Sequence, residues 1–215
     1  MQEMDRIYFR KKIGSVLEAL KKKKFEAYSF ETPAEAKRFL LEQIKPGETV
    51  GIGGSVTLRE TLQLVQEIRK KGNTVYDHWE ADNDPQRRIE LKRSHRGVDV
   101  FLSSTNAIAA DGTLVNLDGG GNRVASLCSG PKRVIVIAGA NKLVESVDEA
   151  IRRTRNRAAV QRVLRSHYKT PCEITGVCSD CNAPQRICAA LLILMQKPAD
   201  IDQFTVVLVN EEMGY

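Results

Sequence analysis

Apolar positions along the chain recur at two spacings, which predict helices and strands in turn. The first helix is expected over residues 3–24, where basic residues occupy the side opposite the apolar one. Its apolar side comprises Ile7, Ile13, Val16, Leu17 and Leu20. This amphipathic helix is expected to cover either the protein's own core or a second subunit, and in the second case the protein would form a homo-oligomer. Residues 25–30 predict a short strand, and Thr32-Pro33 then begins a helix that runs to Ile44.

Short apolar segments of the kind buried in a covered parallel sheet follow at intervals, and a shorter strand is expected at 73–77. The apolar strands are expected at 49–52, 98–104, 133–139 and 204–210. Helices are expected between them at 55–71, 85–94, 147–165 and 184–195. Asp111-Gly112 stands between two apolar segments and predicts a hairpin. We therefore expect one α/β domain over residues 1–215, with a mostly parallel sheet flanked by helices and an inserted hairpin.

Composition narrows the class of protein. Of the 215 residues, 42% are hydrophobic and 28% are charged, which is ordinary for a soluble globular domain. No apolar run approaches the roughly 20 residues of a membrane span, and the charged start has no signal core, so a cytoplasmic location is expected. The net charge of +6 is spread among acidic residues and aromatics are only 6%, so no nucleic-acid partner is expected.

Four of the five cysteines lie close together in the segment 170–195, with the spacing C-x5-C-x2-C-x6-C. They are Cys172, Cys178, Cys181 and Cys188. Clustered thiolates in a chain without a secretory signal favour a metal or cluster site over disulfides. Structural zinc usually brings two CxxC pairs and only one is present, so an iron–sulfur cluster of the 4Fe–4S type is the first expectation and zinc the alternative. Reduced cysteines, or a redox disulfide at the CxxC pair, remain open.

The expected helix from Pro184 adds to this interpretation. With Asn182 as its cap, Cys181 would precede the positive end of the helix and Cys188 would lie near its second turn, which favours both thiolates. Cys128 is expected to be a small buried side chain outside the site.

A glycine-rich loop joins the expected strand 49–52 to the helix after it. Its amides and hydroxyls could hold a phosphate or carboxylate at the helix start. The candidate ligand residues are Gly53, Gly54, Ser55 and Thr57. The loop matches neither the Walker A nor the dinucleotide pattern, and a tight turn without a ligand is an equal alternative.

A second group of polar residues surrounds the hairpin. Asn106, Gly120 and Asn122 are candidate ligand residues, Asp118 is a candidate acid or base, and Arg123 a candidate anion partner. Ligands of open α/β sheets bind beyond the carboxyl ends of the strands, where this group and the glycine loop would meet. The alternative is that Asp118 and Asn122 only shape a turn. His78, His95 and His167 lack metal-ligand spacing and are expected to be surface or hydrogen-bonding residues, while Trp79 packs or lines a cleft.

Several stretches in combination resemble the LUD domain family of lactate-utilisation proteins. They are GIGGSVTLRE, STNAIAADGTLVNLDGGGNRVA, GANK at 139–142, and the closing TPC–TG–C–DC–RIC segment. The resemblance implies a fold similar to the sugar-phosphate isomerase and CoA-transferase group, with the candidate residues above lining an anion pocket. It also implies a link to oxidation of L-lactate to pyruvate beside iron–sulfur partner proteins. Not every member carries the four cysteines, so this chain resembles a cysteine-bearing branch whose substrate the resemblance leaves open.

Three functional hypotheses follow. The first is an iron–sulfur redox component acting on a small carboxylate of the lactate or 2-hydroxy acid class. The second is an isomerase- or CoA-transferase-like enzyme with Asp118 as base, Arg123 fixing the substrate anion and a structural zinc. The third is a non-catalytic sensor or assembly subunit for a small anionic ligand.

Overall fold

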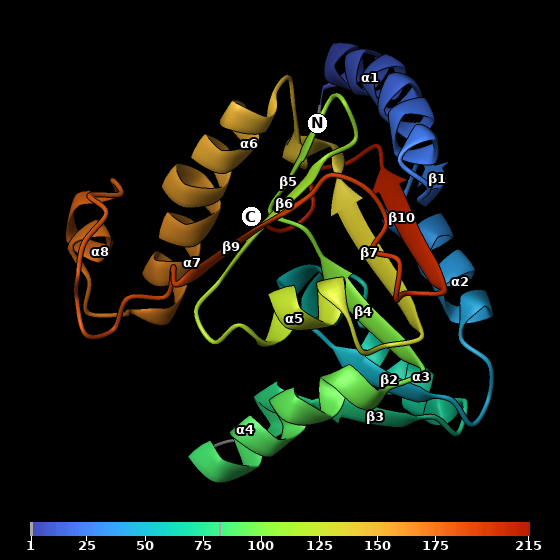
Figure 1. Ribbon diagram of the computed structural model, residues 1–215. Helices are drawn as coiled ribbons and strands as arrows, with labels where there is room; N and C mark the ends of the chain where they lie inside the picture. Colours follow the sequence, from blue (N-terminus) through green and yellow to red (C-terminus); the bar gives the residue numbers. More distant parts are fainter. Residues whose placement is uncertain (1, 82) are drawn as a thin grey trace.

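The computed structural model describes residues 2–81 and 83–215, and its centre is a six-stranded parallel sheet (Figure 1). The order across the sheet is β1 (Glu26–Phe30), β10 (Gln203–Val209), β7 (Arg133–Gly139), β4 (Val100–Ser104), β2 (Thr49–Ile52) and β3 (Thr74–Asp77). Every neighbouring pair runs parallel. The predicted α/β class and mostly parallel sheet are confirmed, because the apolar runs of β4, β7 and β10 are buried on both faces as a covered sheet requires.

A second sheet lies against the first and is larger than the expected hairpin. Its order is β8 (Leu143–Val144), β5 (Ala107–Ala109), β6 (Leu114–Asp118) and β9 (Ala190–Leu194). The hairpin of β5 and β6 turns at Gly112, whose φ of 83° explains the glycine. Two adjacent strands of the central sheet, β4 and β7, lead directly into β5 and β8. The two sheets are therefore joined by two short crossings that lie side by side.

The predicted helix over 184–195 is wrong. Residues 190–194 form β9, which pairs antiparallel with all five residues of β6. The sequence ALLIL favours a helix by intrinsic propensity, but hydrogen bonding to a neighbouring strand outweighs so weak a preference. As a consequence, Cys181 and Cys188 do not flank a helix start, and the expected helix-dipole effect on their thiolates is absent from this described segment.

Two helical layers cover the central sheet. On one face, α2 (Pro33–Gln43) and α3 (Leu64–Lys70) pack against alternate residues such as Ile135 and Ile137. On the other face, α1 (Glu3–Lys22) and α5 (Asn122–Cys128) pack with the second sheet against Val134 and Val136. The outer face of the second sheet is covered by α6 (Val147–Arg153). The strict alternation along β7 explains how one apolar strand serves both cores.

Two of the predicted helices are interrupted. The expected helix 55–71 divides into a π-turn, η1 (Thr57–Thr61), and α3, with Gln63 between them at a φ of 50°. The expected helix 147–165 continues from α6 through the π-turn η5 (Thr154–Ala158) into α7 (Ala159–Ser166). π-turns inside helices are frequent at functional sites, and both turns lie near the cavity described below.

The remaining helices are short, apart from α4 (Pro85–Ser94), which forms as predicted. They are η2 (His78–Ala81), η3 (His95–Gly97), η4 (Ala140–Lys142) and α8 (Pro171–Thr175). Helix α8 was not predicted, although its Thr-Pro start repeats the pattern that begins α2. Within residues 2–81 and 83–215, no helix combines the length and the apolar character needed to cross a membrane.

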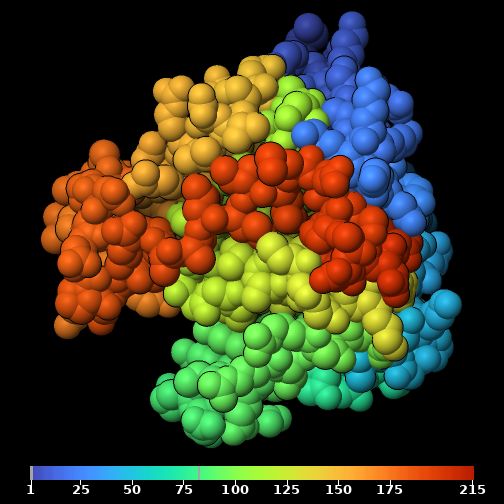
Figure 2. All heavy atoms as spheres, in the orientation of Figure 1, coloured from blue at the N-terminus to red at the C-terminus, as the bar shows by residue number. Residues whose placement is uncertain are grey.

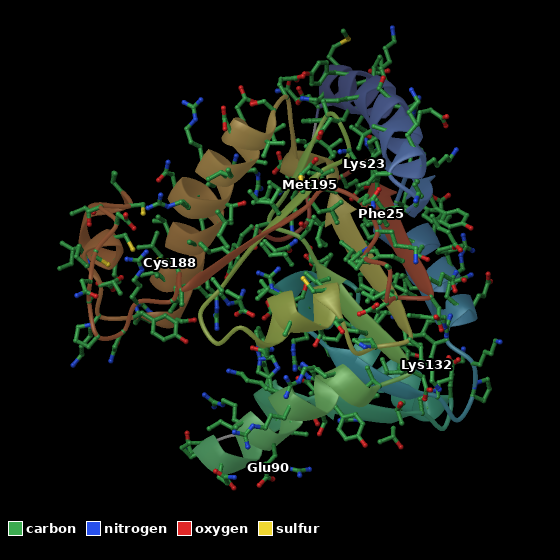
Figure 3. The ribbon with its side chains drawn as sticks, in the orientation of Figure 1. Lys23, Phe25, Glu90, Lys132, Cys188 and Met195 are labelled. Atoms are coloured by element: carbon green, nitrogen blue, oxygen red, sulfur yellow. The ribbon has the colours of Figure 1, made fainter. Side chains whose placement is uncertain are left out.

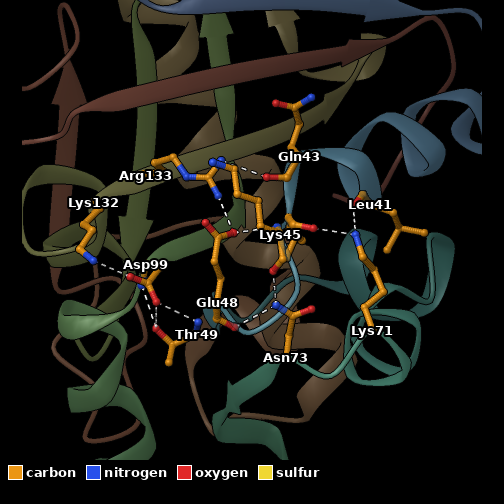
Figure 4. Close-up of polar contacts among 11 residues, drawn as sticks. Leu41, Gln43, Lys45, Glu48, Thr49, Lys71, Asn73, Asp99, Lys132 and Arg133 are labelled. Carbon is orange, nitrogen blue, oxygen red and sulfur yellow. Dashed lines mark hydrogen bonds and ion pairs between the residues drawn. The ribbon is translucent and has the colours of Figure 1, made fainter.

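Charged side chains fasten the amino ends of the central strands (Figure 4). The Asp99 carboxylate accepts hydrogen bonds from Lys132 at 2.7 Å and from the amide and hydroxyl of Thr49 at 3.0 and 2.7 Å. Beside it, Arg133 donates to Glu48 at 2.7 Å. These contacts connect β2, β4 and β7 at one edge of the sheet. The opposite edge, where the strands end, is left for the site.

The predicted capping of α2 by Thr32 can be tested directly. Thr32 and Glu35 form a reciprocal capping box, with Glu35 N donating to Thr32 Oγ1 at 3.3 Å and Thr32 N to the Glu35 carboxylate at 3.0 Å. Thr32→Ala is expected to lower the free energy of unfolding by about 1 kcal/mol in urea denaturation. Thr32→Ser keeps the hydroxyl and should stay within about half of that loss. Equal losses in both variants would contradict a capping role for the hydroxyl.

Candidate functional site

A cavity of about 230 Å³ lies at the carboxyl edge of the central sheet. It is lined by segments that follow β2, β3, β4, β7 and β10, together with the chain between β6 and α5. All predicted site residues of the glycine loop and hairpin region, except Gly53, line it. They are Gly54, Ser55, Thr57, Asn106, Asp118, Gly120, Asn122 and Arg123. The expected convergence at this edge is therefore what the structure shows.

Gly53 has a packing role instead. A Cβ at this position would lie 2.9 Å from Ser103 Oγ and 3.2 Å from the ring of Phe101, so glycine lets β2 approach β4 closely. At Gly54, a Cβ would lie 3.2 to 3.3 Å from the side chains of Trp79 and His78. Glycine at both positions therefore serves close packing around the cavity, and only Gly54 lies on its wall.

Arg123 forms the base of the cavity. Its guanidinium donates to the carbonyls of Ser104 and Leu117 at 3.1 and 2.6 Å, and to the side-chain oxygens of Asn116 and Asn106 at 2.9 and 2.8 Å. Burial lowers the pKa of this guanidinium, which nevertheless stays charged. These four bonds occupy both terminal nitrogens, so Arg123 joins β4, β6 and α5. It contributes a fixed positive charge to the cavity, but its terminal N–H groups are not available to donate to a substrate.

Asp118 both shapes the turn and faces the cavity. Its Oδ2 accepts from the amide of Arg123 at 2.8 Å and more weakly from Val124, so the carboxylate caps the start of α5. In the described part of the chain, Oδ1 accepts no hydrogen bond and remains available to a ligand. The turn-shaping alternative is thus correct for one oxygen, and the second leaves an acid or base role open.

Lys142 was not predicted as a site residue. It ends η4, directly after β7, is only 4% exposed and lines the cavity. Its ammonium donates to Ser104 Oγ at 2.8 Å. Burial, together with the nearby charges of Arg153 and Arg123, lowers the pKa of Lys142 to about 7. The sequence signal that could have identified Lys142 as a site residue is its position just after an apolar strand, within the GANK stretch.

Arg153 supports the same region from α6. It donates to the Asn141 carbonyl at 3.1 Å and to the Asn106 carbonyl. Burial lowers the pKa of Arg153 to about 10. Among the ion pairs of the described residues, none involves Lys142, Arg123 or Arg153. Lys142 and Arg123 thus line one cavity, Arg153 bonds to residues beside it, and none of the three forms an ion pair among the described residues, which favours an anionic ligand.

His78 and Trp79 complete the wall on the β3 side. His78 is buried, and burial together with His95, 5.6 Å away between ring centroids, lowers its pKa to about 3. It is therefore neutral near pH 7, and its Nδ1 has no partner among the described residues. For His78 we predicted either a surface position or a hydrogen-bonding role, and the surface position is wrong because the side chain is buried. His95 lies 3.1 Å from the Tyr76 carbonyl oxygen through Nε2, and His167 is exposed.

The four cysteines line a second, smaller cavity of about 20 Å³, between α7, α8 and the chain before β9. Figure 3 shows Cys188 beside α7. All five cysteines of the chain carry free thiols. Within the described residues, no three His, Cys, Asp or Glu side chains are gathered closely enough to hold one metal ion in this conformation. The four thiols therefore line one cavity, but in this conformation they are too far apart to bind one metal ion together.

Two arginines hold the cysteine-bearing loop. Arg186 donates to the Cys188 and Cys181 carbonyls at 2.9 and 2.6 Å and to Asp180 at 2.9 Å. Arg155 of η5 pairs with Asp180 at 2.8 Å, and both arginines line the small cavity. Four thiols beside two cations suit a centre whose ligands carry net negative charge. Cys128 lies on α5 and away from this cavity, as the sequence predicts.

The two cavities share a wall. Ala159 and Ile187 line both, and Ile187 precedes Cys188 directly. The amide of Ala189 donates to the Asp118 carbonyl at 3.0 Å, and a Cβ on Gly119 would lie 2.9 Å from the Ile187 carbonyl oxygen. In Figure 2 the cysteine-bearing segment forms a lobe separated by a notch from α4. A change in the cysteine loop therefore acts directly on the wall of the larger cavity.

Comparison with known proteins agrees with this description. The model of the LUD domain family matches residues 13–209, so the chain belongs to the LUD domain family and the resemblance drawn from its motifs is confirmed. No curated protein matches the chain.

Two solved structures are similar to the chain. A DUF162 family protein from Deinococcus radiodurans is 12% identical, with 95% of this chain and 98% of that chain covered and a TM-score of 0.49. Ribose 5-phosphate isomerase from Plasmodium falciparum is 18% identical, with 53% and 52% covered and a TM-score of 0.35.

The role of Arg123 can be tested by stability. Arg123→Met leaves four buried acceptors without a donor and is expected to lower the free energy of unfolding by roughly 3 kcal/mol or more. Arg162→Met, on the half-buried wall of the same cavity, should cost less than about 1 kcal/mol. Urea denaturation measures both. Similar small losses would show that the guanidinium does not hold the base of the cavity.

Proposed function

We propose that this protein is a redox component of small-carboxylate metabolism, acting in the cytoplasm on a ligand of the lactate or 2-hydroxy acid class. In this proposal, the larger cavity binds the carboxylate and the four cysteines hold an iron–sulfur centre. The observation that carries it is the shared wall: Ala159 and Ile187 separate a cationic ligand cavity from a cavity lined by four thiols.

The charges of the larger cavity support an anionic ligand. Lys142, Arg123, Lys92 and Arg162 line it, and Asp118 is the only acidic side chain among its described lining residues. A volume of about 230 Å³ suits a small metabolite better than a nucleotide cofactor. A carboxylate there gains charge-assisted hydrogen bonds while it compensates buried positive charge.

The donor set of the smaller cavity fits a cluster chemically. Four thiols that share one cavity provide the ligand set of a 4Fe–4S centre, which would supply one-electron transfer when bound. Cys172 would come from α8, and Cys178, Cys181 and Cys188 from the loop before β9. Arg155 and Arg186 would compensate the negative charge of such a centre. An iron–sulfur oxidoreductase is the partner class that this arrangement would serve.

A second candidate function is supported by Asp118. Because its Oδ1 is left for a ligand, Asp118 could act as the general base of an isomerase- or CoA-transferase-like reaction, with a structural zinc on the cysteines. In that case Asp118→Asn abolishes turnover, whereas Cys→Ser variants mainly lower stability. The metal content below separates this candidate from the first.

Ligand binding can be followed through Trp79, because it is the single tryptophan and lines the cavity. L-lactate or pyruvate is expected to change its fluorescence in a saturable way. Lys142→Met should weaken binding roughly ten- to a hundredfold, since one buried cation is lost. Lys11→Met removes the same charge from the exposed face of α1 and should leave the affinity unchanged. Equal affinity in all three proteins would place the ligand elsewhere.

The metal content tests the redox half of the proposal. Protein purified without oxygen is expected to be brown and to contain about four iron and four sulfide per chain. Cys178→Ser should lose most of the iron, whereas Cys128→Ser should keep it, because Cys128 lies outside the small cavity. Colourless protein with one zinc per chain would reject electron transfer and favour the second candidate.

A further inference from the structure

Lys142 has surroundings that differ from those of the other lysines. It leaves the carboxyl end of β7, its Nζ donates to Ser104 Oγ at the end of the neighbouring strand β4, and the residue is 4% exposed. A Cβ on Gly214 would lie 3.7 Å from Nζ, so the C-terminal segment approaches the amine from the other side. The amine is thus held between two strands and the C-terminal segment, on the wall of the cavity.

No carboxylate stabilises the protonated amine. Among the described residues, Lys142 makes no ion pair, and Arg123 and Arg153 add positive charge nearby. Its pKa of about 7 leaves a large neutral fraction at neutral pH, whereas an ordinary lysine at 10.5 is almost fully protonated. A neutral amine on the wall of a cavity is a nucleophile, and burial of this kind is how lysines are activated for addition to carbonyl groups.

The geometry points to Lys142 as the residue that bonds covalently to a 2-oxo acid in this cavity, as an imine. The inference rests on the proposed function, because the cavity must first accept a small carboxylate. Arg123 is fully engaged with protein acceptors, so Lys92 and Arg162 are the cations on the wall that remain for the carboxylate group. Lys142 lines the same cavity, so a 2-oxo acid whose carboxylate is bound by these cations would present its keto carbon to the Lys142 amine.

The chemical step is balanced without a further reagent. The lone pair of Nζ forms a C–N bond to the keto carbon while the π electrons of C=O move to oxygen, which takes up a proton. One hydrogen of the amine is thereby transferred to the oxygen and gives the carbinolamine, and the second leaves with the hydroxyl group as water when C=N forms. No oxidation or reduction occurs. Because a 2-hydroxy acid has no keto group, this bond would distinguish pyruvate-type ligands from lactate-type ligands.

Reductive trapping tests the inference on the full-length chain. The protein is incubated with pyruvate and sodium cyanoborohydride, and the adduct is located by intact mass and peptide mapping. We expect one reduced pyruvate adduct on Lys142, none with L-lactate, and none in Lys142→Arg, which keeps the charge but cannot form the imine. Lys11→Arg, on the exposed face of α1, should keep the adduct. The initial rate should rise about tenfold between about pH 6 and pH 8 and then level off, as a pKa of about 7 requires.

The outcomes separate this inference from the proposed function. Trp79 fluorescence that saturates with pyruvate while no adduct forms would overturn the imine and leave ligand binding intact. An adduct on Lys92 or on many surface lysines, with a rate that keeps rising above about pH 9, would likewise overturn it. No fluorescence response and no adduct would remove the ligand site itself, and the inference with it.

Discussion

Unpaired positive charge buried where two sheets meet is the constraint on which the site depends. Lys142, Arg123 and Arg153 are all buried or nearly so, and carbonyl and amide oxygens at the ends of β4, β6 and β7 receive most of their hydrogen bonds. Oxygen dipoles solvate these cations without neutralising them. The free-energy cost of burying these cations is offset because β4 and β7 cross side by side into the second sheet, which brings the oxygens of several strand ends to one place. A bound anion would supply the negative charge that balances these cations.

The same junction couples the ligand cavity to the cysteines. Strand β9 closes the edge of the second sheet through β6, and the residues just before it, Ile187 and Cys188, belong to the wall and to the thiol cavity. Ala189 is fixed to Asp118 by a backbone hydrogen bond. The thiols stand apart in this conformation, so assembly of a metal centre requires movement of the loop that carries them. Such movement would reach the ligand cavity through Ile187 and through the hydrogen bond from Ala189 to Asp118.

Sequence reasoning predicted the central sheet closely because its strands are short, apolar and bounded by turns. It also placed the polar loops at the correct edge, since parallel strands end together. It failed where tertiary context decides: β9 has helix-favouring residues but is paired by β6. Lys142 and His78 were missed as site residues because burial, which no single-residue pattern records, gives them their chemistry. Arg123 lines the cavity at the expected edge, but its four internal acceptors are visible only in three dimensions.

The most direct test of the account is the pKa of Lys142, measured by NMR of protein labelled with ¹³C at the lysine ε-carbon and assigned with Lys142→Arg. Buried positive charge without a counterion predicts a titration near 7 in the free protein. L-lactate, an anion that cannot form an imine, should move it upward, because a bound carboxylate favours the protonated amine. A titration near the ordinary 10.5 that lactate leaves unchanged would contradict the account.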